Sequence, residues 1–465
     1  MKLHYGIGGQ DGPEKIHECG LRILSEIGAA FHCEEAVEVF RRHGARVDGQ
    51  TVYIEKEMVE EALRTVPGSF DWYGRLGDKI TVGDGSTHAL PAYGPIYVLV
   101  DGNYEKSSHQ HLVNFHKLCE TSQVVEAANA NIIDVSYVPH EQREKYRIGV
   151  ALQYCTKPMM GLVEGKAAAE MGLSAMRRFY GVQDKPISLG LIDTMGPMRL
   201  NTAMCEALMV YAKERQPLII GPGQSFGITT PQSLAADYTL GNAMILAALV
   251  LTQLISPGTP VVYSGKTDSD DLRMTSAAAY GGIEAMLSGA TAYQMGKFYG
   301  LPVHSGNANT DSKALDYQCG AETFMNLFTA YMNGVDCMLH STAVLDSYNA
   351  VSYEKFLLDE ERILGFQRLL RGYTVSDETL MFEKMKKTGP TGQSFERTQK
   401  SYHTDYYMPK LVQRDGHNAW IAKECPTAET MAAAAWRERI QQYQAPELDQ
   451  AQRAILEELI PESYR

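Results

Sequence analysis

Short apolar runs recur along the chain, and longer segments with helical spacing of apolar residues separate them. Seven of these runs are almost continuously apolar and lack the alternation of polar residues that a half-exposed sheet shows. Such runs are typical of parallel strands covered on both faces, and their spacing leaves room for a crossover helix after each strand. The predicted strands are Asn131–Val135, Pro158–Val163, Ile187–Ile192, Pro217–Ile220, Pro260–Ser264, Leu301–His304 and Asp336–His340.

The repeated strand–helix unit predicts the α/β class, and within it a (β/α)8 TIM barrel. The eighth strand would be Ile96–Val100 or a short segment near Tyr373–Val375, and the sequence does not decide between them. Helix boundaries are marked, for example by Thr230-Pro231 at a start and Ser256-Pro257-Gly258 at an end. The apolar run Ala243–Ile255 is too short to span a bilayer, so we expect it to be a packed barrel helix.

The segments that flank the predicted barrel are helical. Residues 1–90 are predicted to form an N-terminal helical cap, residues 91–390 the barrel body, and residues 391–465 a C-terminal helical extension. No linker rich in Pro, Gly or Ser separates these pieces, so we expect one folded unit. A hairpin is predicted where Ile96–Val100 runs into Asp101-Gly102-Asn103. The predicted flanking elements are Gly12–Ile27, Glu34–His43, Thr51–Ile54, Glu55–Thr65, Thr427–Gln442 and Glu447–Ile460, all helices except the short strand Thr51–Ile54.

Composition narrows the class of protein. With 465 residues, 44% of them hydrophobic, the chain can bury a large core. The net charge of −13, from 43 basic and 56 acidic residues, argues against a nucleic-acid partner. The N-terminus has no secretory signal pattern, so we expect a cytoplasmic enzyme that does not bind a membrane. The eight cysteines include no CxxC pair, which favours reduced structural thiols.

A parallel barrel places its active site at the C-terminal ends of the strands, and this rule selects the candidate chemistry. The polar candidates are Glu164, Asp193, Gln224, Lys266, Asp268, Arg273, His304, Asp311, Gln318, Glu322 and His340. The aromatic candidates beside them are Tyr93, Tyr97, Phe226, Tyr263, Tyr280, Tyr317, Tyr348 and Phe356. Tyrosine outnumbers phenylalanine by 26 to 13, which is compatible with a cavity that is apolar in its body and polar at its edge.

Three interpretations of these residues compete: a metal site, a general acid–base pair, and a cage for a cationic ligand. The metal site is disfavoured, because Cys337 and His340 lie three apart on a predicted strand and would point to opposite faces. The chain also has no HExxH motif and no Cys/His set at zinc spacing, so we predict no bound metal. His304 fits a hydrogen-bonded core residue equally well, whereas the position of His340 before a polar loop favours a functional role.

Several segments in order along the chain carry a family resemblance. They are IHECGLRILSEIG (Ile16–Gly28), YGPIYVLVD (Tyr93–Asp101), SPGTPVVYSG (Ser256–Gly265), TDSKALDYQCG (Thr310–Gly320) and FLLDEE (Phe356–Glu361). Together they resemble the trimethylamine:corrinoid methyltransferase superfamily, and the match runs nearly end to end. The resemblance implies a TIM barrel that moves a methyl group from an amine to the cobalt of a separate corrinoid protein.

One departure from the family pattern bears on the substrate. The trimethylamine enzymes carry pyrrolysine in the barrel, whereas this chain has only ordinary residues. It therefore resembles the non-pyrrolysine branch, whose members demethylate quaternary amines such as glycine betaine, proline betaine, carnitine or γ-butyrobetaine. Transfer from a quaternary nitrogen releases a neutral tertiary amine, so no proton has to be delivered. The protein then has to orient the reactants, and the cofactor supplies the difficult chemistry.

A quaternary ammonium group has no hydrogen to donate, so aromatic faces hold it best. The cage candidates are Tyr93, Tyr97, Tyr317, Tyr348 and Phe356. His340, and after it Gln318, would bind the carboxylate of a betaine; Arg273, Lys313 and the N–H groups near Thr310 are alternatives. The predicted catalytic set is His340, Gln318, Asp311 and Glu164, in which Asp311 and Glu164, like Glu322, would add electrostatic attraction for the cation.

The predicted partner is a corrinoid protein that docks on the C-terminal face of the barrel. Gly221, Gly223 and Gln224 form a tight turn after a strand, which would let the corrinoid come close. The chain has no DxHxxG corrinoid-binding segment, so the cofactor would arrive on its carrier. We also expect a homo-oligomer, with the N-terminal helices as a plausible interface. Two alternatives stay open, namely a quaternary-amine sensor on a barrel scaffold and a zinc-dependent thiol methyltransferase.

Overall fold

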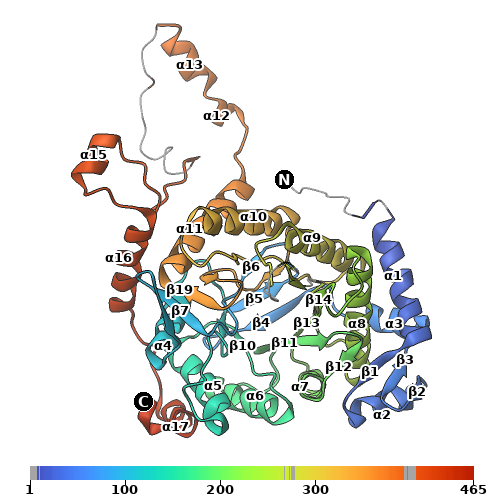
Figure 1. Ribbon diagram of the computed structural model, residues 1–465. Coiled ribbons are helices and arrows are strands. Elements are labelled where there is room, and N and C mark those ends of the chain that lie inside the picture. Colours follow the sequence, from blue (N-terminus) through green and yellow to red (C-terminus); the bar gives the residue numbers. More distant parts are fainter. Residues whose placement is uncertain are drawn as a thin grey trace.

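The computed structural model describes residues 8–9, 11–265, 268–271, 273, 278–391, 395 and 405–465. The protein is of the mixed α/β class, and its helices surround a central group of parallel strands (Figure 1).

Eight short parallel segments pair in a cyclic order. β6 (His88–Ala89) pairs with β17 (Cys337–Met338), and Ala89 also bridges to Val125 just before β9. From β9 the pairing passes through β10, β11 and β13 to β15. Val303 bridges to β15 and His304 bridges to β17, so the order returns to its start. The four strands after β9 (Ala128–Asn129) are β10 (Met159–Met160), β11 (Ser188–Met195), β13 (Leu218–Gly223) and β15 (Val261–Tyr263).

Six predicted strands coincide with members of this ring and are confirmed. They are Pro158–Val163, Ile187–Ile192, Pro217–Ile220, Pro260–Ser264, Leu301–His304 and Asp336–His340.

The prediction of Asn131–Val135 as a strand is wrong, because the paired residues are Ala128–Asn129 and the chain turns directly afterwards. The turn has a local cause: the Asn131 backbone N–H donates to Asn129 Oδ1 at 2.9 Å, a side-chain bond typical of asparagine in turns.

Both predicted positions for the eighth strand are also wrong. β6 occupies that place, and its two residues form no apolar run that a pattern could detect. Ile96–Val100 instead corresponds to β7 (Tyr97–Val100), which forms the predicted hairpin with β8 (Asn103–Lys106) in a separate sheet. β18 (Val344–Leu345) and β19 (Ala350–Ser352) complete that sheet. Tyr373–Val375 follows a helix and is exposed.

Long helices alternate with the parallel segments and cover them (Figure 1). They are α4 (His109–Thr121), α5 (Arg143–Tyr154), α6 (Lys166–Tyr180), α7 (Thr202–Lys213), α8 (Leu234–Ile255), α9 (Ile283–Phe298), α10 (Tyr317–Asn333) and α11 (Tyr353–Arg371). α8 is apolar enough to cross a membrane by composition, but 89% of its apolar window is buried inside the protein. A helix that is apolar on every side is expected when neighbours cover every side.

The N-terminal segment covers the outer side of α8. α1 (Gly12–Arg22) continues into a π-helical turn at Ile23–Ile27 and packs on α8, as do α2 (Glu34–Arg42) and α3 (Lys56–Thr65). The three predicted N-terminal helices are therefore confirmed, and their apolar faces are buried against their own chain. The short strands beside them are β1 (Ala29–Phe31), β2 (Arg46–Asp48), β3 (Thr51–Tyr53) and β12 (Arg199–Leu200).

A hairpin and the inner faces of the ring share one core. β4 (Phe70–Tyr73) and β5 (Lys79–Val82) place Trp72 and Ile80 in the cluster formed by inward residues of the ring. Those inward residues include Met160, Leu189, Ile219 and Val262. The Trp72 indole N–H donates to the Ile187 carbonyl at 3.2 Å, so its polar atom is satisfied inside the core.

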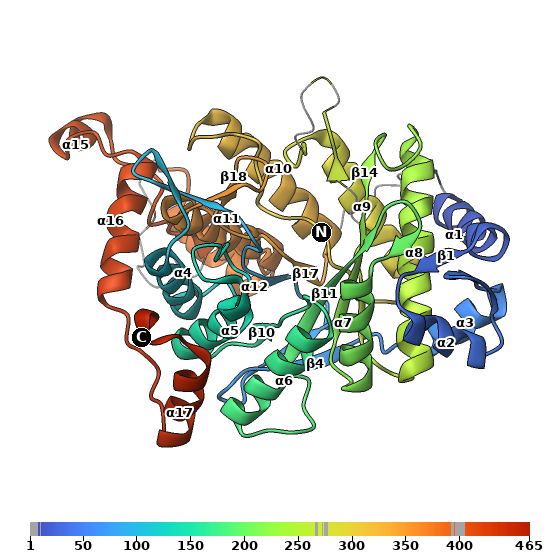
Figure 2. The same cartoon turned by 60° about the horizontal axis from the view of Figure 1, so that its bottom comes forward.

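The C-terminal segment runs along the flank opposite α1–α3 (Figure 2). α16 (Ala428–Gln441) packs on α11 and α4, and α17 (Gln450–Leu459) packs on α5 and α6. Both predicted tail helices are thus confirmed. Between α11 and α16 the chain leaves the body and forms α12 (Asp377–Leu380), α13 (Phe382–Thr388) and α15 (His417–Ala422) (Figure 1). The remaining short elements are β14 (Ser225–Phe226), β16 (Asp268–Ser269), η2 (His140–Gln142) and η3 (Glu462–Tyr464).

Candidate functional site

A hydrogen-bonded group of polar side chains lies at the C-terminal ends of consecutive parallel segments. Asn131, two residues after β9, donates from Nδ2 to the Tyr93 hydroxyl at 3.0 Å and to Glu164 Oε1 at 3.1 Å. Its Oδ1 accepts a hydrogen bond from Arg147 Nη1 at 2.8 Å, and Arg147 also lies 3.4 Å from Glu164. Asn131 is buried, so this one amide fixes an aromatic ring and a carboxylate side by side.

Burial and neighbouring charges tune the groups around Asn131. Burial raises the pKa of Tyr93 well above its usual range, and the nearby Glu164, Tyr348 and Asp193 raise it further. The Tyr93 hydroxyl therefore stays neutral, while Glu164 and Asp193 open toward solvent. Burial, followed by the negative charge of Glu164, raises the pKa of Glu144 to about 7.

A second group of aromatic rings includes His340 and Tyr348, which lie on the loop after β17. The rings of His340 and Tyr348 meet edge to face, with centroids 4.9 Å apart and planes at 85°, and Tyr280 lies 6.1 Å from Tyr348. Gly94 has a φ of +83°, and a Cβ at this position would lie 3.1 Å from the Tyr348 hydroxyl. Glycine at this position thus lets Tyr348 come close to the backbone that follows Tyr93.

The loop that carries His340 and Tyr348 is strained. Non-glycine residues with positive φ cost roughly 1–3 kcal/mol each and persist only where the surroundings hold them. Here Ser341 Oγ donates to the Leu90 carbonyl at 2.7 Å, and Ser347 Oγ donates to Asp311 at 2.9 Å. The non-glycine residues of this loop with φ between 49° and 80° are His340, Ala343, Asp346, Ser347 and Tyr348.

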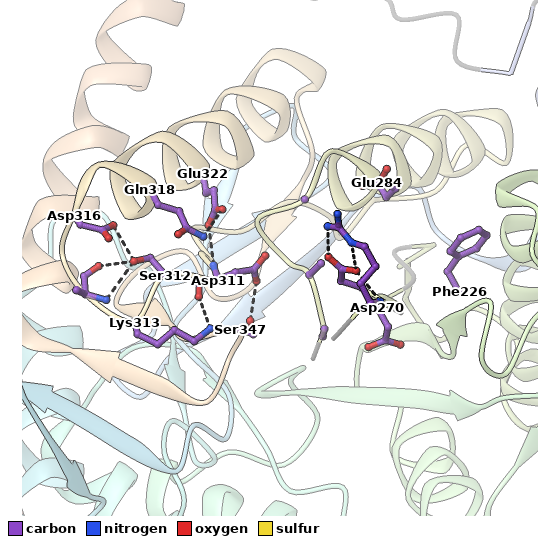
Figure 3. Close-up of a pocket in the computed structure, with 16 residues that line it drawn as sticks. Phe226, Asp270, Glu284, Asp311, Ser312, Lys313, Asp316, Gln318, Glu322 and Ser347 are labelled. Atoms are coloured by element: carbon purple, nitrogen blue, oxygen red, sulfur yellow. Dashed lines mark hydrogen bonds and ion pairs between the residues drawn. The ribbon is translucent and has the colours of Figure 1, made fainter. Parts of the chain in front are cut away.

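Beside this loop opens a cavity of about 960 Å³ (Figure 3). Figure 3 shows one wall of the cavity formed by Asp311, Gln318, Glu322 and Ser347. Across from it lie Phe226, Asp270 and Glu284. The Asp311 carboxylate accepts bonds from the N–H groups of Tyr280 and Gly281, both at 3.0 Å. Burial outweighs these bonds and raises the pKa of Asp311.

Glu322 and Gln318 belong to the same wall of the cavity. Glu322 accepts hydrogen bonds from Thr310 Oγ1 at 2.6 Å, from the Asp311 N–H at 2.8 Å and from Gln318 Nε2 at 2.9 Å. Lys313 donates to the Asp311 carbonyl and pairs with Asp346. These groups therefore hold the cavity wall in place, and their hydrogen-bonding capacity is largely used within it.

The structure brings together only part of the predicted cage. Tyr93 and Tyr348 adjoin each other, but Tyr317 is 92% exposed at the start of α10. Phe356, a residue of α11, is 1% exposed and packs in the core, and the ring of Tyr97 packs against that of Tyr104. These last three residues do not lie with the aromatic group around His340.

Of the three residues predicted to face the corrinoid, only Gly221 lies at the candidate site. Gly221 pairs with Asp193, and a Cβ on it would lie 3.1 Å from Asp193 Oδ1, so Gly221 belongs to the strand ends at the site. Gly223 is packed against the Thr194 carbonyl. Gln224 is 3% exposed and donates to the carbonyl and carboxylate of Asp237, so it anchors α8.

The remaining polar candidates predicted from the sequence are His304, Arg273, Lys266 and Asp268. His304 is buried and its Nδ1 lies 2.8 Å from Ser264 Oγ. Arg273 is exposed and pairs with Asp271 at 2.6 Å. Lys266 and the side chain of Asp268 lie outside the described residues. Within the described part of the chain, no group of three or more His, Cys, Asp or Glu residues could hold a metal ion.

Sequence reasoning missed three residues of the site, namely Asn131, Glu144 and Arg147. The sequence pattern predicted a strand at Asn131–Val135, which put Asn131 at the start of the strand and not after its end. The observed strand is Ala128–Asn129, and the rule that site residues follow strand ends would then have selected Asn131. Glu144 and Arg147 stand three residues apart on α5 and reach the site from a helix, for which no strand-end signal exists.

Fold and site together define an α/β protein that gathers carboxylates and aromatic rings at the C-terminal ends of a parallel ring. The model of the family MTTB, trimethylamine methyltransferase, matches residues 4–463, and the chain belongs to this family.

Two relatives and one solved structure are similar over nearly the whole chain. The glycine betaine methyltransferase of Desulfitobacterium hafniense (strain Y51) is 33% identical over 453 residues, which are 96% of this chain and 94% of that protein. The proline betaine:corrinoid methyltransferase of Eubacterium limosum is 33% identical over 468 residues, 97% and 96% of the two chains. The crystal structure of the Methanosarcina barkeri monomethylamine methyltransferase superposes with a TM-score of 0.51 at 12% identity, covering 94% and 88%. That last likeness concerns the fold alone.

Proposed function

We propose that this protein transfers a methyl group from a quaternary amine of the betaine class to Co(I) of a corrinoid carried by a separate protein. The observation that carries the proposal is the placement of Tyr93, Tyr348 and His340 beside the solvent-exposed residues Glu164 and Asp193. Aromatic faces and carboxylates attract a cation that has no hydrogen to donate. Relatives that act on glycine betaine and proline betaine support the same substrate class.

The reaction needs no proton transfer. The Co(I) electron pair forms the new bond to the methyl carbon, the N–CH3 bond breaks, and its electron pair stays on the nitrogen as a neutral tertiary amine. The side chains of the site therefore have to hold the cation with one methyl group directed toward the acceptor. A neutral Tyr93 suits this role, because its face attracts the cation without forming an ion pair.

We assign the carboxylate end of the betaine to His340. Its ring contacts Tyr348, so one loop would bind both ends of the substrate. Gln318 ranks second, because its amide already donates to Glu322. Glu164 would attract the ammonium group, whereas Asp311, bonded to two N–H groups and Ser347, would position the loop.

We infer further that the ring of eight parallel segments is a (β/α)8 barrel, and that the corrinoid protein docks where the strands end. Gly221 lies at that mouth beside Asp193 and leaves room for the approach of a cofactor. The N-terminal cap would then end before β6 at His88, and residues 391–465 would form the extension.

The proposal is tested by following methyl-cobalt absorbance with purified protein, reduced corrinoid protein or free Co(I) cobalamin, and a panel of amines. The panel contains glycine betaine, proline betaine, carnitine, γ-butyrobetaine and trimethylamine. We expect methylation with one or more quaternary amines and none with trimethylamine.

Two results would contradict the proposal. Binding of a betaine in calorimetry without methyl transfer to an active corrinoid would indicate a sensor. Methyl transfer to an added thiol and not to cobalt, lost when a zinc ion is removed from the purified chain, would indicate a zinc-dependent enzyme of the thiol class.

A further inference from the structure

The segment that begins in the last turn of α11 exposes many apolar side chains. Residues 369–391, here called the arm, include the end of α11 and all of α12 and α13. Within 17 consecutive residues the arm exposes eight large apolar side chains, each between 38% and 84%. They are Leu369, Leu370, Tyr373, Val375, Leu380, Met381, Phe382 and Met385.

The two helices of the arm bury no side chain against the part of the chain that the structure describes. α12 has four residues and α13 has seven, and neither contains a buried residue. Helices this short are marginal in water unless an apolar face packs on something. In Figure 1 the arm extends outward past α10 and α11, away from the ring of helices. Among the described residues, none buries these apolar side chains, and a second molecule packed on the arm would do so.

The exposed area suits a protein interface. With about 100 Å² left on each side chain, the eight residues offer roughly 800 Å² of apolar surface. The largest apolar patch of a typical monomer is about 300–600 Å², and a stable complex buries about 800 Å² per partner.

A receiving surface exists at the base of the arm. A groove of about 610 Å³ lies between α11, α16 and residues 407–411, and its apolar lining includes Val124, Leu357, Leu364 and Leu411. Its charged lining has three glutamates, Glu360, Glu361 and Glu438, and two cations, Lys410 and Arg439. Glu360 and Arg439 pair with each other inside the groove, so Glu361, Glu438 and Lys410 leave it with one net negative charge. α13 carries three lysines and one glutamate, so its net positive charge is opposite in sign to that of the groove.

We propose that the arm binds a second copy of this chain, with α13 seated in the groove between α11 and α16 of that copy. An arm and a groove on every chain allow a twofold pair in which each contact occurs twice and no surface is left open. A protein that brings its cofactor to the strand ends would leave the arm uncovered, because the arm projects beside the ring. This interface differs from the one expected from sequence on the N-terminal helices, whose buried apolar faces pack on α8.

The first test is the mass of the full chain in solution, by sedimentation equilibrium and light scattering from about 1 to 100 µM. We expect twice the 51.5 kDa of one chain. The triple variant Leu380→Glu/Phe382→Glu/Met385→Glu should run as a single chain with an unchanged circular dichroism spectrum, because none of the three side chains is buried. The matched control Ile27→Glu/Leu76→Glu changes side chains that are 59% and 74% exposed elsewhere, and it should remain paired.

A second test asks whether the arm of one copy binds in the groove of the other. Phe382→Cys in one tagged protein and Leu364→Cys in another, mixed and oxidised, should give a linked pair that neither protein gives alone. The exposed native Cys19 and Cys425 are replaced by serine in both proteins. A single chain at every concentration, or a pair that survives the three glutamates, would overturn the proposal. Protection of arm amides from hydrogen exchange only after a corrinoid protein is added would overturn it in favour of that partner.

Discussion

Lys355 and Asp359 form a buried ion pair that joins two loops of the site. Their Nζ and Oδ2 atoms lie 2.8 Å apart, and both side chains are less than 5% exposed. Lys355 also donates to the Ala308 carbonyl at 2.7 Å, and Asp359 accepts the Ala343 N–H at 2.9 Å. Ala308 follows His304, and Ala343 lies between His340 and Tyr348, so one pair of charges on α11 fixes both loops.

Replacement of Lys355 by methionine should therefore destabilise the protein. It leaves the Asp359 charge buried without its cation, which typically costs about 3–5 kcal/mol. In urea unfolding, the double variant Lys355→Met/Asp359→Leu should lose less than the single one, because no uncompensated charge remains. Lys313→Met, at a lysine that is 64% exposed and pairs with Asp346, is the control and should cost less than about 1 kcal/mol. Equal losses in the single and double variants would show that the ion pair is not the cause.

The aromatic group should bind the ammonium end of the substrate. Tyr348→Leu removes a ring that contacts His340, and it should raise the calorimetric dissociation constant for a betaine about 2- to 30-fold, as expected for roughly 0.5–2 kcal/mol. Tyr348→Phe keeps the ring and should bind nearly as well as the unchanged protein. Tyr317→Leu, at a tyrosine that is 92% exposed, should have no effect. A larger effect at Tyr317 than at Tyr348 would place the cage elsewhere.

Glu144 should make stability depend on pH. Its pKa is raised from 4.5 to about 7, so the folded protein holds this proton more tightly than the unfolded chain does. Its contribution is favourable below pH 4.5 and is lost as the pH rises through 7. Glu144→Gln should then be more stable than the unchanged protein at pH 8, by about 1 kcal/mol after solvent screening.

The pH effect has a clear control. Near pH 4.5 the difference between Glu144→Gln and the unchanged protein should vanish. Glu141→Gln, at an exposed carboxylate of the same segment, should show no comparable gain at pH 8. A gain for Glu144→Gln that is the same at both pH values would rule out ionisation of Glu144 as its origin.

Metal removal should leave the reaction unaffected. The described residues hold no cluster of His, Cys, Asp and Glu that suits a metal ion. Dialysis of the isolated chain against a chelator, before corrinoid is added, should not change the rate of methyl transfer. Elemental analysis of the same sample should find less than one zinc per chain. A rate that falls and returns with added zinc would refute this prediction.

The sequence by itself determined those features that depend on residues close together in the chain. The apolar runs at Pro217–Ile220 and Pro260–Ser264 are strands, because short apolar runs that begin at a proline are typical of strands covered on both faces, whereas the longer apolar run at Ala243–Ile255 belongs to a helix. The helices near both termini and the hairpin at Asp101-Gly102 follow from local periodicity and turn chemistry. Of the residues that meet in the candidate site, the sequence had already selected Tyr93, Tyr348, Glu164 and His340 as candidates.

Only the tertiary structure decided which of these groups meet. β6 becomes a ring strand through pairing with β17, almost 250 residues later, and not through any pattern of its own. Asn131 joins Tyr93 to Glu164 across 38 and 33 positions of sequence. Tyr317 and Phe356 look equivalent in sequence, yet one faces solvent and the other the core, because helix packing sets the direction of each side chain. Contacts between distant residues depend on the packing of the whole chain, and a local pattern cannot report them.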